Sequence, residues 1–242
     1  MTVAPTPLHG RAPHRRWLLA AAAAALVGAG IVIGLVINGR VGDTSTGVGV
    51  EGSGVPATET RDVASFAAVD LAGSNDVTIH VGGKPSVVVS ADDNLLDHVT
   101  TRVEGGRLVI GTIPGSFSTR SPMNVDVTVP SLDALTLSGS GIVSADGIDS
   151  DKLTVALPGS GVLRASGAAT TLHVDHSGSG DAQLEGLTAR NVHAVLGGSG
   201  RIVVTATKSL DATVSGSGAI FYRGDPAQVT TNVTGSGTVL RG

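Results

Sequence analysis

The residues whose types and spacing could support chemistry are two histidines and two aspartates in the C-terminal half of the chain. His173 and His193 each lie five residues before a Gly-Ser-Gly triplet, and Asp211 lies five residues before the next one. Asp175 follows His173 by two residues. If the triplets mark a repeat, these four side chains share one outward face, and histidines with carboxylates can bind zinc. The alternative is a solvent-exposed polar face on which two histidines stack.

Two further polar features carry weaker signals. His176 falls at a position that is otherwise apolar in the repeat, so we expect a core histidine with a backbone hydrogen-bond partner. Asp146, Asp149 and Asp151 lie close together, and Ca²⁺ prefers several oxygen ligands. They lack the spacing and the glycine of an EF-hand loop, so an ordinary acidic turn is the alternative.

The catalytic groups of an enzyme are not apparent in the sequence. Polysaccharide-cleaving enzymes need carboxylates that project together, whereas we expect Asp146, Asp181, Glu185 and Asp225 to be scattered over the outward positions without sharing a column. The chain has no cysteine nucleophile, and aromatic residues amount to only 2%. The sequence therefore predicts a protein without catalytic activity and without a cofactor.

A repeat of about 19 residues organises the C-terminal half. Gly-Ser-Gly occurs six times, with spacings of 20, 19, 20, 18 and 19 residues. Apolar residues stand six, four and two positions before most triplets, and again four and six positions after the first glycine, as in strands with one buried face. The triplets are Gly139–Gly141, Gly159–Gly161, Gly178–Gly180, Gly198–Gly200, Gly216–Gly218 and Gly235–Gly237.

This unit predicts the fold. About 19 residues are too few for a βαβ unit or a propeller blade, but they suit one coil of a parallel β-helix. We expect an all-β protein with such a β-helix over 131–242, of right-handed coiling by default. The triplet glycines should provide tight corners with positive φ and close backbone approach. Residues 58–130 contain the β-runs VTIHV, SVVVSA, GRLVIG and NVDVTVP, so we expect an irregular N-terminal cap and first coils there.

The N-terminal region has the pattern of a membrane anchor. Residues 17–37 (WLLAAAAAALVGAGIVIGLVI) carry no charge, and 21 residues reach about 30 Å, the thickness of a bilayer core. Arg11, Arg15 and Arg16 precede the run, which predicts a cytoplasmic segment 1–16 and an extracytoplasmic C-terminal domain. The Gly/Ser/Thr-rich segment 38–57 is expected to be a flexible linker. A cleaved signal peptide is the alternative to a retained anchor.

The charge distribution excludes one class of partner. The first 40 residues hold four arginines and no acid, so the remaining 12 basic residues face 20 acidic ones. An acidic body without a basic stripe argues against nucleic-acid binding, which depends on neutralising phosphates.

Two segments and the coils that follow them resemble a known bacterial family. ADDNLLDHVTTRVEGGRLVIG (Ala91–Gly111), VTVPSLDALTLSGSG (Val127–Gly141) and the Gly-Ser-Gly coils are similar to the auto-transporter adhesin head, or GIN, domain. The resemblance covers roughly Arg61–Gly242 and implies a β-helix exposed on the cell envelope. With the anchor, it implies a single-pass bacterial membrane protein that adheres to cell-wall polysaccharide or surface proteins. A carbohydrate-active enzyme and an envelope sensor are the alternatives.

Overall fold

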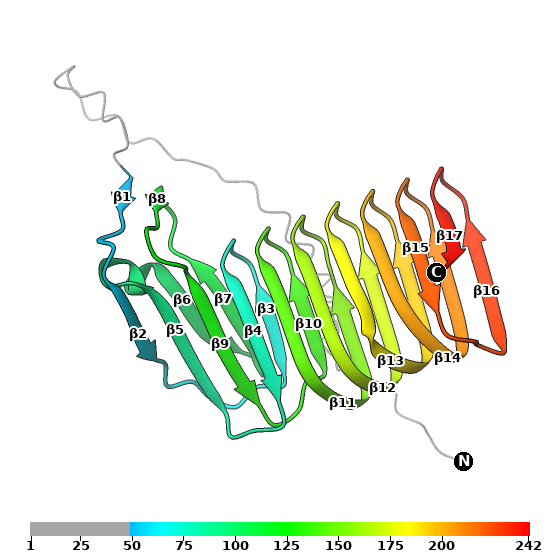
Figure 1. Ribbon diagram of the computed structural model, residues 1–242, viewed down its shortest axis with the longest axis horizontal. Helices are drawn as coiled ribbons and strands as arrows, with labels where there is room; N and C mark the ends of the chain where they lie inside the picture. Colours follow the sequence, from blue (N-terminus) through cyan, green and yellow to red (C-terminus); the bar gives the residue numbers. More distant parts are fainter. Residues whose placement is uncertain (1–48) are drawn as a thin grey trace, which may run out of the picture. The chain divides into compact units, whose positions relative to one another are not determined.

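Four long strands form the centre of the molecule (Figure 1). In the computed structural model, which describes residues 49–242, β11 (Ile142–Ala156), β12 (Val162–His176), β13 (Asp181–Leu196) and β14 (Arg201–Val214) stack in parallel register. Each runs from one Gly-Ser-Gly corner to the next and bends at a second turn, where the register shifts. The predicted parallel β-helix is therefore confirmed, while its right-handed coiling stays a prediction.

The core consists of the predicted inward columns. Leu153 and Val155 of β11, and Leu157 directly after it, are 0% exposed, and the residues that stack on them in the next three coils are buried too. Inward and outward side chains alternate because successive residues of a strand point to opposite faces. The coil of the first triplet departs from the repeat at one position: before β10 (Ala134–Leu137), Leu132 is buried and Asp133, six residues before the triplet, is exposed.

Only one of the two predicted reasons for glycine at the triplets, close backbone approach, is confirmed. Among residues 49–242, positive φ occurs at second-turn glycines such as Gly147 (71°) and Gly224 (90°), and at none of the Gly-Ser-Gly glycines. The triplet glycines are required because coils approach closely. A Cβ atom on Gly178, for example, would overlap the carbonyl oxygen of Gly159 in the coil below. The positive-φ expectation was therefore wrong for the corners, and the close-approach expectation was right.

The solenoid extends further towards the N-terminus than the repeat indicated. Strands β3 (Ala68–Leu71) and β7 (Arg107–Thr112) continue the stack below β10, and β4 (Asp76–Val81) and β9 (Asn124–Val129) continue it below β11. Gly139 and Gly141 lie directly against residues 73 and 75 of the segment Gly-Ser-Asn. This segment is a degenerate triplet, so two ordered coils lie within the region predicted to be irregular.

Antiparallel strands close the N-terminal end of the solenoid (Figure 1). Strand β5 (Ser86–Asp92) pairs antiparallel with β9 and with β2 (Pro56–Thr60), and β6 (Val99–Glu104) pairs antiparallel with β7. The 3-10 helix η1 (Asp93–His98) places Leu95 in the core. These elements cover the first coil, as expected for the cap of a solenoid.

The linker predicted over 38–57 ends earlier than expected. Strand β1 (Val50–Glu51) pairs with β8 (Phe117–Ser118), and β2 begins at Pro56. The physical reason is the buried side chain of Asp92, which reaches the backbone of this segment and accepts a hydrogen bond from Gly54 N at 3.0 Å. Composition alone did not reveal this partner, which lies 38 residues away in the sequence.

Asp92 joins three segments at the capped end. Its carboxylate also accepts hydrogen bonds from Arg120 N at 2.8 Å, from Ser121 N at 3.3 Å and from Ser121 Oγ at 2.7 Å. It occupies the N-cap position of η1 but makes no capping hydrogen bond to that helix. Desolvation acts to raise the pKa of Asp92, and the four hydrogen bonds to the carboxylate outweigh it and lower the pKa below 3.8.

This arrangement predicts a pH-dependent loss of stability. Because the folded-state pKa is lowered, the stabilisation by Asp92 is complete above the unfolded-state value and is lost as the pH falls through the folded-state value. We expect Asp92→Asn to lower the urea midpoint at pH 7, and the difference from wild type to shrink below pH 3.8. Asp126→Asn, at an exposed position of β9, is the control. Its urea midpoint should match that of wild type at pH 7 and below pH 3.8. Equal midpoints for Asp92→Asn and wild type at pH 7 would contradict the role of this carboxylate.

The chain begins with residues outside the described range and ends in the last coil of the solenoid. Residues 1–16 and the predicted anchor at 17–37 lie outside the described residues. Within 49–242, no helix is long and apolar enough to cross a bilayer. At the other end, β16 (Gln228–Val233) pairs with β14 and β17 (Thr238–Arg241) pairs with β15 (Ala219–Arg223). Val229 and Val233, at inward positions of this last coil, are each 44% exposed.

Candidate functional site

The structure places three of the four predicted site residues in one column. His173 of β12, His193 of β13 and Asp211 of β14 are register partners on successive coils. They face outward because the residues on either side of each of them are buried. Asp175 lies on the same face in the neighbouring column, where its partner in β13 is Val195. The repeat therefore placed all four residues on the correct face.

The two imidazole rings stack, and one of them contacts a carboxylate. The ring centroids of His173 and His193 are 5.0 Å apart, with an interplanar angle of 8°. His193 Nδ1 lies 3.4 Å from Asp211 Oδ2. The side chains of His193 and Asp211 are about half exposed, at 50% and 52%, so this pair contributes little to folding stability.

This geometry does not assemble a metal site. Zinc binds imidazole nitrogens at about 2.0–2.1 Å, so two ligating nitrogens lie at most about 4.2 Å apart. Parallel rings 5.0 Å apart must turn before they can share an ion. In the part of the chain that the structure describes, no group of three or more histidine, aspartate or glutamate residues is arranged to hold a metal. Metal binding by His173, His193, Asp211 and Asp175 stays a prediction.

The electrostatic surroundings favour a neutral ring at His173. Burial, followed by the positive charges of His193 in its protonated form and of Lys152, lowers the pKa of His173 below 6.5. A neutral imidazole carries one hydrogen-bond donor and one acceptor. At neutral pH, His173 can therefore serve as either toward a ligand.

A groove runs across this face over three coils. Its volume is about 340 Å³, within the range of ligand sites. It is lined by Lys152 and Thr154 of β11, His173 and Asp175 of β12, and His193 and Val195 of β13. Sequence reasoning missed the contributions of Lys152, Thr154 and Val195. These residues precede their triplets by seven, five and three residues, which are outward positions of the repeat, so their place on this face could have been predicted from the spacing.

Comparison with known proteins identifies the family. The model of the family described as "Putative auto-transporter adhesin, head GIN domain" matches residues 65–226. The chain belongs to this family. The match covers most of the GIN domain described above, from the capped end to the last coils, and it confirms the resemblance seen in the sequence.

Solved structures share the fold of this GIN domain. A putative adhesin from Bacteroides fragilis has 22% identity and a TM-score of 0.67, and the match covers 80% of this chain and 100% of that one. A putative lipid binding protein from Parabacteroides distasonis has 24% identity and a TM-score of 0.51, with 80% and 99% covered. No curated protein matches the chain. At these identities the likeness establishes the fold alone.

His176 is a core residue of the GIN domain, as predicted. Its side chain is 0% exposed and lies in the inward column between Leu157 and Leu196. Nδ1 lies 2.8 Å from the carbonyl oxygen of Leu157, and Nε2 lies 2.7 Å from that of Gly180. A neutral ring can donate to one of these carbonyls, and an imidazolium can donate to both. Gly200 leaves the space for this ring, because a Cβ there would overlap Nε2.

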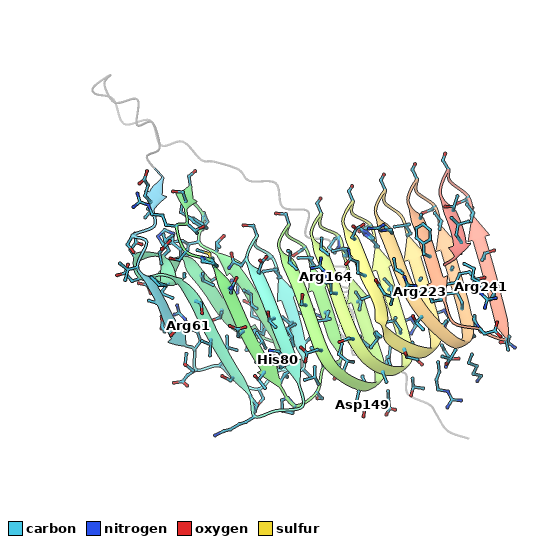
Figure 2. All side chains as sticks on the ribbon, in the orientation of Figure 1. Arg61, His80, Asp149, Arg164, Arg223 and Arg241 are labelled. Carbon is cyan, nitrogen blue, oxygen red and sulfur yellow. The ribbon has the colours of Figure 1, made fainter. Side chains whose placement is uncertain are left out.

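One of the three clustered aspartates lies apart from the other two in the GIN domain. Asp146 pairs with His80 of β4 at 2.9 Å, whereas Asp149 projects from the second turn (Figure 2). Asp149 and Asp151 line a shallow depression with Asp133 from the preceding coil. Hydrogen bonds within this segment involve Ser150 and the backbone of Lys152. Asp149 and Asp151 therefore stay together while Asp146 lies apart, and the acidic-turn interpretation stays a prediction.

The remaining acids considered for catalysis are apart from one another. Asp181 pairs with Arg201 at 3.0 Å, and Asp225 pairs with Arg241 at 3.1 Å. Figure 2 shows Arg241 on the last coil and Arg164 near the middle of the solenoid. Glu185 lines a hollow that also includes Asp146 and Arg164. Asp146 and Glu185 each lie seven residues after the first glycine of a triplet, two coils apart, so the expectation that these acids share no position was wrong for this pair.

Proposed function

We propose that this GIN domain is a non-catalytic binding module that adheres to the cell wall or to cell surfaces. The observation that carries the proposal is the outward face of β11–β14, on which polar side chains repeat at equivalent positions of successive coils. Such a face offers many equal contacts to an extended partner, as solenoid surfaces do. Membership of a family described as adhesin heads supports the same conclusion.

The position of the domain in the cell is a second part of the proposal. The uncharged run at 17–37, preceded by three arginines, supports a single-pass anchor with a cytoplasmic N-terminus. The domain then projects from the outer side of a bacterial cell membrane, where polysaccharides and other surface molecules are available to it. The proposal includes no enzymatic step, no cofactor and no nucleic acid partner.

Adhesion of beads coated with the purified full-length chain tests the proposal. The beads are offered to bacterial cells, purified cell-wall polysaccharide, lipid vesicles and a bare surface, each with and without a chelator. We expect saturable adhesion to cells or cell wall that soluble protein competes away. Beads coated with heat-denatured protein provide the control. Adhesion that does not exceed this control on any surface would refute the proposed function, and loss on chelation would show that adhesion depends on a divalent metal.

A further inference from the structure

The groove between β11 and β13 contains polar groups that the domain itself does not use. In the described residues 49–242, the side chains of Lys152, His173 and Asp175 form no hydrogen bond and no ion pair. Some charged side chains elsewhere on the solenoid are paired, for example Arg201 with Asp181 at 3.0 Å. Donors and acceptors that converge on a concave surface without internal partners are available to a ligand.

The combination of donors and acceptors indicates the chemistry of that ligand. Lys152 only donates, Asp175 only accepts, and Thr154 and a neutral His173 do both. A ligand that satisfies all of them must itself donate and accept at neighbouring atoms, as hydroxyl groups do. Val195, which is 44% exposed at the groove, adds an apolar contact that suits the C–H face of a sugar ring.

The charges of the groove argue against a polyanion. One lysine is opposed by Asp175 in the groove and by Asp211 beside it, and the pKa of His173 is lowered. Acidic polymers bind to surfaces on which cations predominate. This surface has no excess of positive charge at neutral pH, so an uncharged ligand fits it better than a polyuronate, a polyphosphate or a nucleic acid.

The orientation of the groove sets the shape of the ligand. Its lining residues come from three successive strands that are stacked about 4.8 Å apart, so it extends about 10 Å along the solenoid axis. Equivalent polar positions continue on β14 and β16 with Asp211 and Thr230. A linear molecule with repeated hydroxyl groups can lie along this column, and one sugar unit cannot span it.

We propose that the groove lined by Lys152, His173, Asp175, His193 and Val195 binds an uncharged polysaccharide chain that lies across the strands. This inference rests on the proposed function and adds to it the site and the ligand class. The two histidines and the aspartate hydrogen-bond to sugar hydroxyls, and Val195 contacts a ring face.

Calorimetric titration of the full-length chain with uncharged oligosaccharides tests the inference. Gluco-, manno- and galacto-oligosaccharides of two, four and six units are compared with polygalacturonate, an acidic polymer. We expect at least one uncharged series to bind, with affinity rising at least tenfold from two to four units, and polygalacturonate to bind more weakly. His173→Ala and His193→Ala should each weaken binding at least tenfold while the thermal midpoint stays unchanged.

A matched variant controls for indirect effects. Gln183→Ala changes an outward residue of β13 on the other side of the Gly-Ser-Gly corner and should alter affinity less than twofold. The inference fails if no uncharged series binds, if polygalacturonate binds best, or if the histidine variants bind as wild type does. If beads still adhere to cell wall in those cases, the proposed function stands with a different site. If adhesion is absent as well, both fail.

Discussion

Alanine at Gly198 is expected to destabilise the domain by about 3 kcal/mol, while alanine at the adjacent Gly197 is expected to be neutral or stabilising. A Cβ on Gly198 would overlap the backbone of Gly178 in the coil below, including its carbonyl oxygen. That oxygen accepts the hydrogen bond from Ser199 N, at 3.1 Å. The coils must therefore separate locally, and ladder hydrogen bonds are lost.

Gly197 provides the matched control for this effect. The nearest atom to a Cβ on Gly197 is Ser215 Oγ at 3.8 Å, an ordinary contact, and its φ is not positive. Alanine there restricts the unfolded chain and should raise stability by about 0.4–1 kcal/mol. Urea unfolding of the two variants and wild type gives the comparison. Equal midpoints for the two variants would contradict the close-approach explanation of the triplets.

Aspartate at Leu157 is expected to have the largest effect of any single substitution considered, at least about 4 kcal/mol and enough to unfold neighbouring coils. Leu157 is 0% exposed in the inward column beside His176, whose two ring nitrogens already lie 2.8 and 2.7 Å from carbonyl oxygens. An unpaired charge in such a site loses its hydration without compensation. Hydrogen exchange measured by mass spectrometry should show increased exchange in β10–β12.

Thr154→Asp is the control for Leu157→Asp. Thr154 lies three residues earlier, on β11, at an exposed outward position near Lys152 and His173. The same carboxylate is hydrated there, so the variant should unfold within about 0.5 kcal/mol of wild type. If Leu157→Asp is as stable as Thr154→Asp, the assignment of inward and outward columns is wrong.

The features of the fold that recur in every coil could be predicted from the sequence, and the features outside the repeat could not. Columns such as Leu153, Leu172 and Val192 recur at fixed distances from a triplet, so their burial could be read from spacing alone. The first coils escaped notice because a long insertion separates Gly73 from Gly139, although the two lie in contact. The role of Asp92 was not predictable, because its partners Gly54 and Ser121 are 38 and 29 residues away in no repeating pattern.

The candidate site was predicted in position and not in geometry. Spacing placed His173, His193 and Asp211 in one column, and the structure confirms this. The spacing of residues along the chain does not determine side-chain orientation, so it could not predict that the two imidazole rings stack in parallel. The groove was equally hidden, because it depends on an exposed Val195 beside the polar residues.

Hydroxyl-radical footprinting of the full-length chain bound to insoluble cell wall tests most directly whether the outward face of β11–β14 is the binding surface. Oxidation of each residue is compared between free and bound protein by mass spectrometry. We expect protection of His173 and His193 and unchanged oxidation of Phe221. Phe221 faces outward on β15, on the other side of the Gly-Ser-Gly corner from the histidines. Protection of Phe221 with unchanged oxidation of both histidines would contradict this expectation.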